Sequence, residues 1–288
     1  MRVTIKSSDD YISRRRIKMT LLKSDYVFCV DSDGCAMDTM TYKHQLFFGP
    51  IAADEFEISD RETFLKEWDK VNLFSRTRGV NRFVALLMLL EFANVDNIDN
   101  LKSWVETTPS LSNASLEAEI AKNPATDLKK ALVWSNEVNR QIKSYDGDVL
   151  AFEGAKEGLI HLHELGKLFI VSSANKEAVV EEWEDQELMP YIDDLYCQDR
   201  GKKEDVIAML IAEGYDPCKI MMIGDSPGDL HAAEMNNVKF YPILVGKEKE
   251  SWLTLKSEVA DKFINDQLTE QDFENYATTF WDNLDKER

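Results

Sequence analysis

The sequence has no long apolar segment. No stretch approaches the roughly 18 consecutive apolar residues that a membrane-spanning helix needs. Its opening residues, MRVTIKSSDDYISRRRIKM, also lack the apolar core of a signal peptide. These two absences predict a cytoplasmic protein without a membrane partner.

Paired cysteines and positive charge are scarce as well. Cys29, Cys35, Cys197 and Cys218 show no spacing typical of a zinc site, and we expect no disulfides. Lys and Arg number 34 against 53 Asp and Glu, which gives a net charge of -19. Because nucleic acids and anionic membranes bind basic surfaces, this charge argues against both as the main partner. An anionic ligand would need local positive charge.

What is present indicates a folded protein. The 288 residues can hold one large or two medium domains, and 44% hydrophobic with 30% charged residues is ordinary for such a chain. The most informative stretch is Tyr26 to Met40, YVFCVDSDGCAMDTM. Its uninterrupted apolar run predicts a strand buried in a parallel sheet. Asp31 and Asp33 then lie at the carboxyl end, the edge where open α/β sheets bind ligands.

Three further segments follow in a fixed order. They are Leu168 to Ser173 (LFIVSS), Arg200 to Ile207 (RGKKEDVI) and Ile220 to Asp229 (IMMIGDSPGD). Two are apolar runs that end in hydroxyls or carboxylates, and the third places lysines at the start of an amphipathic helix.

Together the four segments resemble the four motifs of the haloacid dehalogenase (HAD) superfamily of phosphohydrolases, over roughly Ser24 to Ile243. The resemblance implies a Rossmann-like α/β core with a parallel sheet and an inserted α-helical cap domain. We expect the core at 1–41 and 147–288 and the cap at 42–146. Between the first two motifs, apolar residues do occur at helical spacing, in Arg61 to Val71, Arg82 to Ala93 and Leu128 to Ile142. The Gly-Pro pair in Gln45 to Ala53 predicts a break at the cap entrance.

The resemblance assigns different tasks to the first two aspartates. Asp31 would be the nucleophile that accepts the phosphoryl group, and Asp33 would protonate the leaving oxygen and then deprotonate water. Relatives that are dehalogenases or phosphonatases lack the second Asp, so Asp33 favours phosphate esters. Cys35 departs from the usual Thr, which concerns local geometry rather than mechanism.

The second and third motifs would hold the phosphoryl group. The resemblance implies that the Ser172 hydroxyl donates to a phosphoryl oxygen, and the backbone amide of Ser173 would face the same anion. Lys203 would offset negative charge, with Lys202 left as the alternative. Glu204 stands where most relatives have Pro.

The fourth motif completes an oxygen-rich site suited to Mg²⁺. Asp31, Asp225 and Asp229 would be its carboxylate ligands, and the family pattern adds the backbone carbonyl of Asp33. Asp229 could instead be a helix N-cap, and an N-cap is also the favoured interpretation of Asp38.

The expected cap contains a basic segment, NLFSRTRGVNR, with Arg76, Arg78 and Arg82. In a chain this acidic, these arginines could clamp a substrate phosphate or carboxylate. The alternative is that they pair with surface acids.

We therefore predict a Mg²⁺-dependent phosphohydrolase that acts on a small phosphorylated metabolite through an aspartyl-phosphate intermediate. A phosphosugar mutase with the same chemistry and a non-catalytic binding protein on a hydrolase core are the alternatives. A dehalogenase is disfavoured by Asp33 and the metal-ligand aspartates. The sequence indicates neither the substrate nor an oligomeric state.

Overall fold

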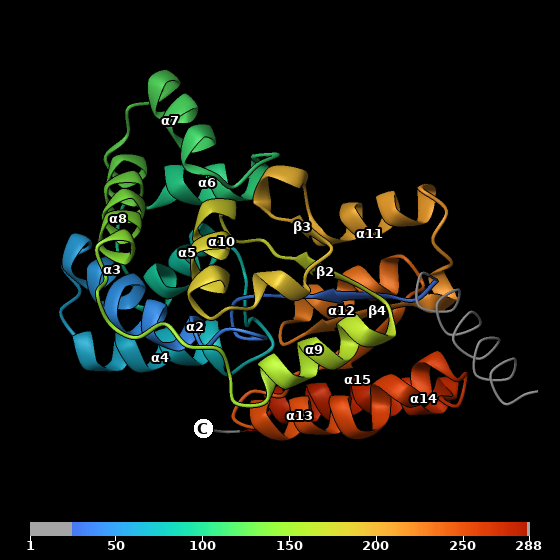
Figure 1. Cartoon of the computed structure of the whole chain (residues 1–288). Coiled ribbons are helices and arrows are strands. Elements are labelled where there is room, and N and C mark those ends of the chain that lie inside the picture. The colour runs from blue at the N-terminus through green and yellow to red at the C-terminus, as the bar shows by residue number, and fades with distance from the viewer. Residues whose placement is uncertain (1–24, 287–288) are drawn as a thin grey trace, which may run out of the picture. The chain divides into compact units, whose positions relative to one another are not determined.

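The structure, a computed structural model that describes residues 25–286, contains a five-stranded parallel sheet (Figure 1). The strand order is β3-β2-β1-β4-β5, and every neighbouring pair is parallel. The strands are β1 (Val27–Val30), β2 (Lys167–Val171), β3 (Asp194–Tyr196), β4 (Ile220–Gly224) and β5 (Lys239–Pro242). This confirms the predicted Rossmann-like α/β fold class.

β1 lies between β2 and β4, and all four of its residues are buried. Val30 is in register with Ile170 on one side and Ile223 on the other. A strand covered by neighbours and helices can be apolar throughout, which explains the unbroken run in the sequence. The three central strands therefore end side by side, and the residues that follow them share one edge.

Seven α-helices accompany the sheet in the described chain after residue 150, together with shorter helical turns. The α-helices are α9 (Ala155–Leu165), α10 (Lys176–Asp185), α11 (Lys203–Ala212), α12 (Pro227–Met235), α13 (Glu248–Thr254), α14 (Ala260–Ile264) and α15 (Glu270–Leu284). The turns are η2 (Met189–Tyr191), η3 (Gln198–Arg200), η4 (Pro217–Lys219) and the π-helical η5 (Leu255–Val259). α9 packs beside α13 and α14, as Figure 1 shows.

The segment between the first two motifs is helical, as predicted. Its elements are α2 (Met40–Tyr42), the π-helix η1 (Lys43–Phe48), α3 (Gly49–Glu55), α4 (Arg61–Leu73), α5 (Arg82–Phe92), α6 (Asp99–Thr107), α7 (Asn113–Lys122) and α8 (Thr126–Lys143). The predicted Gly-Pro break is wrong. Pro50 is the second residue of α3, which continues directly from the π-helix η1, so the helical chain runs through the Gly-Pro pair without a break.

Aromatic side chains fill the core of these helices. Trp68, Phe83 and Trp134 are almost fully buried, and their rings meet edge to face. Trp134 also donates a hydrogen bond from Nε1 to the carbonyl of Phe48, at 3.0 Å. A buried indole N–H needs such a partner, so this contact satisfies the ring without disturbing the apolar core.

The described chain divides into two compact units. The first runs to Met37 and includes Leu150–Asp225 and Asp229–Phe280, and the second holds Asp38–Val149, Ser226–Gly228 and the residues from Trp281 onward. The predicted domain ranges 1–41, 147–288 and 42–146 stay a prediction. None of the helices among residues 25–286 is long and apolar enough to cross a membrane.

Candidate active site

Three buried aspartates gather at the carboxyl edge of the sheet. Asp31 directly follows β1, Asp225 directly follows β4, and Asp229 lies in the first turn of α12. Each offers a carboxylate oxygen, and these oxygens all lie within 4.8 Å of one another. The backbone N–H of Asp225 also donates to Asp229 Oδ2 at 3.2 Å. Parallel neighbouring strands bring residues far apart in sequence to one point.

Gly224 makes room for this arrangement. A Cβ atom at Gly224 would lie 2.2 Å from Asp229 Cγ, closer than unbonded atoms can approach. The third aspartate can therefore reach the cluster only because residue 224 has no side chain.

Lys203, the first residue of α11, enters the same cluster. Its Nζ lies 2.6 Å from Asp31 Oδ2 and 2.5 Å from Asp229 Oδ1. Only 8% of Lys203 is exposed. Lys202 is exposed, and its Nζ lies 3.7 Å from Glu204 instead. Of the two lysines that the sequence left open, Lys203 is the one that contacts the aspartates.

The charges in the cluster shift one another's pKa. Burial raises the pKa of Asp31 to about 8, Lys203 opposes the rise, and the neighbouring carboxylates add to it. Burial alone would lower the pKa of Lys203, but the two aspartates that it contacts raise it above the ordinary range of a lysine. The lysine therefore stays charged, and without a metal ion Asp31 binds a proton more readily than an ordinary aspartate.

The donor set fits a hard divalent cation. Three carboxylate oxygens converge without a His or Cys ligand among residues 25–286, and Mg²⁺ prefers this oxygen chemistry. The cluster could therefore hold a metal ion. Asp33, whose backbone carbonyl was the predicted fourth ligand, lies two residues after Asp31 and is half-buried.

The turn that carries Asp33 is tightly hydrogen-bonded. The Ser32 carbonyl accepts from the backbone N–H groups of Cys35, Ala36 and Met37, at 3.2, 3.0 and 2.9 Å. Gly34 has φ 81°, a conformation that other residues rarely adopt. Each of these contacts lies within residues 32–37, so the turn is a compact local unit.

Cys35, in the position where relatives have Thr, is fully buried. Its thiol donates to the Ile223 carbonyl at 3.5 Å. Burial raises the pKa of this thiol well above its usual value, and the nearby aspartates add to the rise. A neutral buried thiol serves here as a small packing residue and not as a nucleophile.

The second predicted motif follows β2. Ser172 is buried, its backbone N–H donates to the Tyr196 carbonyl, and its hydroxyl oxygen accepts from Ala174 N at 3.2 Å. Ser173 is exposed. Asn175 caps the following helix, because its Oδ1 accepts from Ala178 N. The motif thus joins a buried strand end to the N-terminus of α10.

The three arginines of the basic segment have separate partners. Arg76 forms a bidentate salt bridge with Asp285, at 2.7 and 2.6 Å, and stacks over Trp281 at 4.7 Å. Arg82 donates to Ser135 and Asn139. Burial lowers the pKa of Arg82 to about 10. These two side chains are therefore engaged within the second unit.

Arg78 is the buried member of the set. It donates from Nη1 to the Leu73 carbonyl at 2.8 Å. Burial raises the pKa of Asp38, and the nearby charge of Arg78 opposes that rise. The next residue, Gly79, lies against Ser226, since a Cβ atom there would be 3.0 Å from Ser226 Cβ. The substrate clamp stays a prediction.

Both N-cap interpretations from the sequence are wrong. α2 begins after Thr39, so Asp38 is not its N-cap. Asp229 is the third residue of α12, inside the helix, and its carboxylate belongs to the aspartate cluster. A helix N-cap would precede the first turn, and Pro227 begins the helix two residues earlier than the pattern suggested.

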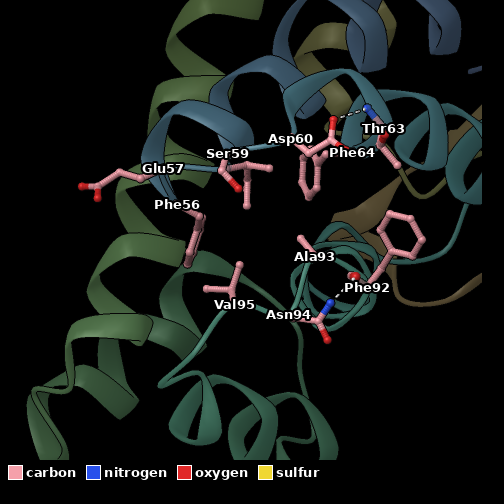
Figure 2. A pocket seen from close by; sticks show the side chains of 11 residues that line it. Phe56, Glu57, Ser59, Asp60, Thr63, Phe64, Phe92, Ala93, Asn94 and Val95 are labelled. Atoms are coloured by element: carbon pink, nitrogen blue, oxygen red, sulfur yellow. Dashed lines mark hydrogen bonds between the residues drawn. The ribbon is translucent and has the colours of Figure 1, made fainter.

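The second unit also has a pocket of about 390 Å³ that is open to solvent on one side (Figure 2). Figure 2 shows three phenylalanines around it, Phe56, Phe64 and Phe92. Its lining carries Glu57 and Asp60 but no lysine or arginine. None of the predicted site residues lines it, and its charge does not suit an anionic substrate.

Two tryptophans that the sequence analysis missed contact the first motif. Trp183 Nε1 donates to Ser32 Oγ at 2.8 Å, and Trp252 Nε1 donates to the Cys35 carbonyl at 3.0 Å. Trp183 precedes the third motif and Trp252 follows the fourth, so no local pattern linked either to the aspartates.

The fold and the site define an α/β protein with a carboxylate and lysine centre at the end of its sheet. A model of the family described as haloacid dehalogenase-like hydrolase matches residues 100–243, which are 144 of the 288 residues. The chain belongs to this family. The match begins after Asp31, so the first motif is supported by its place in the fold.

A solved structure agrees with the fold, and two others are similar to a smaller degree. One, from Lactobacillus delbrueckii subsp. bulgaricus and named provisionally as a phosphoglycolate phosphatase, is 16% identical with a TM-score of 0.51, over 85% of this chain and 99% of that chain. A provisional phosphoglycolate phosphatase from Haemophilus somnus 129PT is 11% identical, with a TM-score of 0.48, over 76% and 85%. A provisional beta-phosphoglucomutase from Thermotoga maritima is 16% identical, with a TM-score of 0.44, over 83% and 97%. No curated protein matches.

Proposed function

We propose that this protein is a Mg²⁺-dependent phosphohydrolase that acts on a small phosphate ester through an aspartyl-phosphate intermediate. The observation that carries the proposal is the Lys203 ammonium between Asp31 and Asp229, with Asp225 in the same cluster. A buried site that pairs a carboxylate nucleophile with a fixed cation suits the transfer of a dianionic phosphoryl group.

In this mechanism Asp31 attacks phosphorus, and the bond to the ester oxygen breaks. Asp33 gives a proton to the leaving oxygen, and then takes one from the water that hydrolyses the aspartyl phosphate. The Ser172 hydroxyl and the Ser173 amide hold phosphoryl oxygens, and Lys203 offsets their charge. The attack requires Asp31 to be ionised, which Lys203 favours. Attack of water on the aspartyl phosphate then releases inorganic phosphate and returns Asp31 as a carboxylate.

Asp31, Asp225 and Asp229 would hold the Mg²⁺, with the Asp33 carbonyl as the further ligand. When bound, the ion neutralises charge on the transferring group and on the carboxylates. Members of the family generally use Mg²⁺, and carboxylate oxygens like those of the three aspartates are the ligands that this ion prefers.

The cap would select the substrate. Arg78 is the arginine that we propose as a substrate ligand, because a buried guanidinium binds a carboxylate or phosphate in fixed geometry. Arg76 and Arg82 would support the segment on either side of it through their own partners.

The test is phosphate release from a panel of sugar, nucleotide and small organic phosphates, with and without Mg²⁺. We expect turnover that needs the metal and that Asp31→Asn abolishes. Asp96→Asn, an exposed residue of the second unit, makes the same chemical change away from the site and should retain activity.

Other outcomes identify the alternatives. Conversion of a sugar phosphate into its isomer with little phosphate release would indicate the mutase. Turnover that survives Asp31→Asn would refute the aspartyl-phosphate mechanism. If no phosphate ester reacts in the presence of Mg²⁺, the hydrolase proposal fails and the binding-protein alternative takes its place.

A further inference from the structure

Two buried indole rings hold the turn that carries the first two aspartates. Trp183, from α10, donates to the side chain of Ser32, and Trp252, from α13, donates to the backbone of Cys35. Both tryptophans are fully buried, as are both acceptor residues. All four belong to the first unit. The two contacts hold the turn of residues 32–37 at its first residue, Ser32, and at its fourth, Cys35.

Ser32 is the centre of that turn. It lies between Asp31 and Asp33, its own N–H donates to Asp31 Oδ1 at 2.8 Å, and its carbonyl accepts three backbone N–H groups. A shift of Ser32 would therefore move the nucleophile and the proton-transfer residue together. Trp183 is the contact, distant in sequence, that fixes its side chain.

Hydrogen bonding alone does not make a tryptophan part of an active site. Trp134 makes a comparable buried bond to the Phe48 carbonyl in the second unit. The difference lies in the acceptor. Trp134 reaches a helix carbonyl, whereas Trp183 reaches the hydroxyl of the residue between the two aspartates.

The Trp183 contact has a second consequence, because Trp183 lies in α10. This helix begins just after Ser172 and Ser173, with Asn175 as its N-cap, and Trp183 lies near its other end. One rigid helix thus connects the predicted phosphoryl-binding serines to the turn of the nucleophile. Displacement of the helix would change both positions at once.

We propose that Trp183 and Trp252 are positioning residues that hold Asp31 and Asp33 in their reactive arrangement through Ser32 and Cys35. The inference rests on the proposed phosphohydrolase function. Neither indole touches the reacting atoms. Their effect is on the rate of the chemical step, because a misplacement of about 1 Å can cost on the order of a hundredfold in rate.

The test compares Trp183→Phe, Ser32→Ala and the double variant with Trp134→Phe. Trp183→Phe removes the N–H and keeps an aromatic ring, and Ser32→Ala is a smaller change that removes the acceptor. Trp134→Phe removes a buried indole hydrogen bond of the same kind in the other unit. We would measure kcat and KM on the best substrate of the panel, and hydrogen exchange of the Cys35, Ala36 and Met37 amides.

We expect each single variant to lower kcat by roughly tenfold or more with KM nearly unchanged, because the misplaced aspartates act mainly in the transition state. The kcat of the double variant should be no lower than that of the single variants, since each substitution removes the same hydrogen bond. The three amides should exchange faster in Trp183→Phe. Trp134→Phe should leave kcat and these amides unchanged.

Additive losses in the double variant, or equal losses of kcat in Trp183→Phe and Trp134→Phe, would overturn the inference. Unchanged exchange of the three amides would overturn it as well. A parent protein without any turnover would refute the proposed function. Hydrogen exchange of the three amides in Trp183→Phe would then test on its own whether the indoles hold the turn.

Discussion

The Nζ of Lys203 lies 2.6 Å from Oδ2 of Asp31, inside a cluster that also holds Asp225 and Asp229. Three carboxylates buried together repel one another and lose their hydration, and both effects disfavour the charged state. Lys203 is a cation that offsets two of them, Asp31 and Asp229, and it lies in the first turn of a helix whose dipole slightly disfavours positive charge. Its position there is best explained by the carboxylates.

Removing the Lys203 charge should therefore be costly. We expect Lys203→Met to lower the free energy of unfolding by about 3–5 kcal/mol at neutral pH without metal, because it leaves buried carboxylates without their cation. Phosphate release should also be lost. Urea unfolding monitored by fluorescence measures the stability, and the phosphate assay measures the turnover.

The adjacent lysine is the matched control. Lys202 is exposed and contacts none of the aspartates, so Lys202→Met should change stability by less than about 0.5 kcal/mol. Equal losses in the two variants would mean that the ion pairs of Lys203 do not stabilise the cluster.

The metal-free protein should lose stability as the pH rises from about 4 to about 8. An unfolded Asp titrates near pH 4. In the folded chain burial raises the pKa of Asp31 to about 8. Between these values the folded state binds more protons than the unfolded state, so the free energy of unfolding falls with rising pH. Lys203 does not titrate in this window, since its pKa is raised.

Mg²⁺ should reverse that trend, because it competes with protons for the same carboxylates. We expect the melting temperature to rise more on adding Mg²⁺ at pH 8 than at pH 5.5, and EDTA should abolish the difference. Asp225→Asn, which removes a carboxylate ligand, is the control, and Mg²⁺ should raise its melting temperature only slightly at either pH. An equal shift at both pH values in the parent would contradict the raised pKa of Asp31.

Much of this site was predictable because its residues follow apolar strands. The run before Asp31 and the run before Asp225 each predict a buried parallel strand, and parallel strands end at one edge. The fold class and the aspartate cluster follow from that rule. Lys203 was expected from the family resemblance and from its spacing to the following helix, with Lys202 left as the alternative. The helices of the cap were readable from periodicity for the same local reason.

Contacts between distant side chains were not predictable. Trp183 and Ser32 are 151 positions apart, and Arg76 and Asp285 are 209 apart. Neither pair leaves a periodic pattern, since each depends on how completed elements pack. The arginines illustrate the consequence, because residues close in sequence have partners in different segments of the chain.

The close approach at Gly224 gives a test of the metal cluster. Gly224→Ala would place a Cβ atom 2.2 Å from Asp229 Cγ, and the aspartate would have to move. We expect Mg²⁺ affinity to fall at least tenfold by isothermal titration, as ligand misplacement typically costs about 10–100-fold. Gly228→Ala is the control, because its Cβ would meet only Ser226 Oγ at an ordinary 3.5 Å. Unchanged affinity in Gly224→Ala would exclude Asp229 as a ligand.

Arg78 and Arg76 should differ in their effect on substrate binding. A buried charge-assisted hydrogen bond contributes about 1.5–3 kcal/mol, so Arg78→Met should raise KM roughly 10- to 100-fold. Arg76 is exposed and paired with Asp285, and Arg76→Met should leave KM unchanged with a stability loss below about 1 kcal/mol. Steady-state kinetics on one substrate measures both variants. The reverse order of effects would make Arg76 the ligand.

Gly158 in α9 packs closely against the six-membered ring of Trp252, the residue whose Nε1 binds the Cys35 carbonyl. A Cβ atom at Gly158 would lie 2.5 Å from Trp252 Cε3. In a helix interior Gly→Ala usually stabilises by about 0.5–1 kcal/mol, but here the clash should reverse the sign and cost about 1–3 kcal/mol. Because Trp252 binds the Cys35 carbonyl, kcat should fall with the stability.

The smaller side chain in Trp252→Leu relieves this clash. Gly158→Ala should therefore be neutral or stabilising in that background, by thermal unfolding, although it destabilises the parent. A loss of equal size in both backgrounds would mean that the added methyl group disturbs α9 itself and not the ring of Trp252. Recovery of stability in the double variant, without recovery of kcat, would separate the packing of this indole from its hydrogen bond to the catalytic turn.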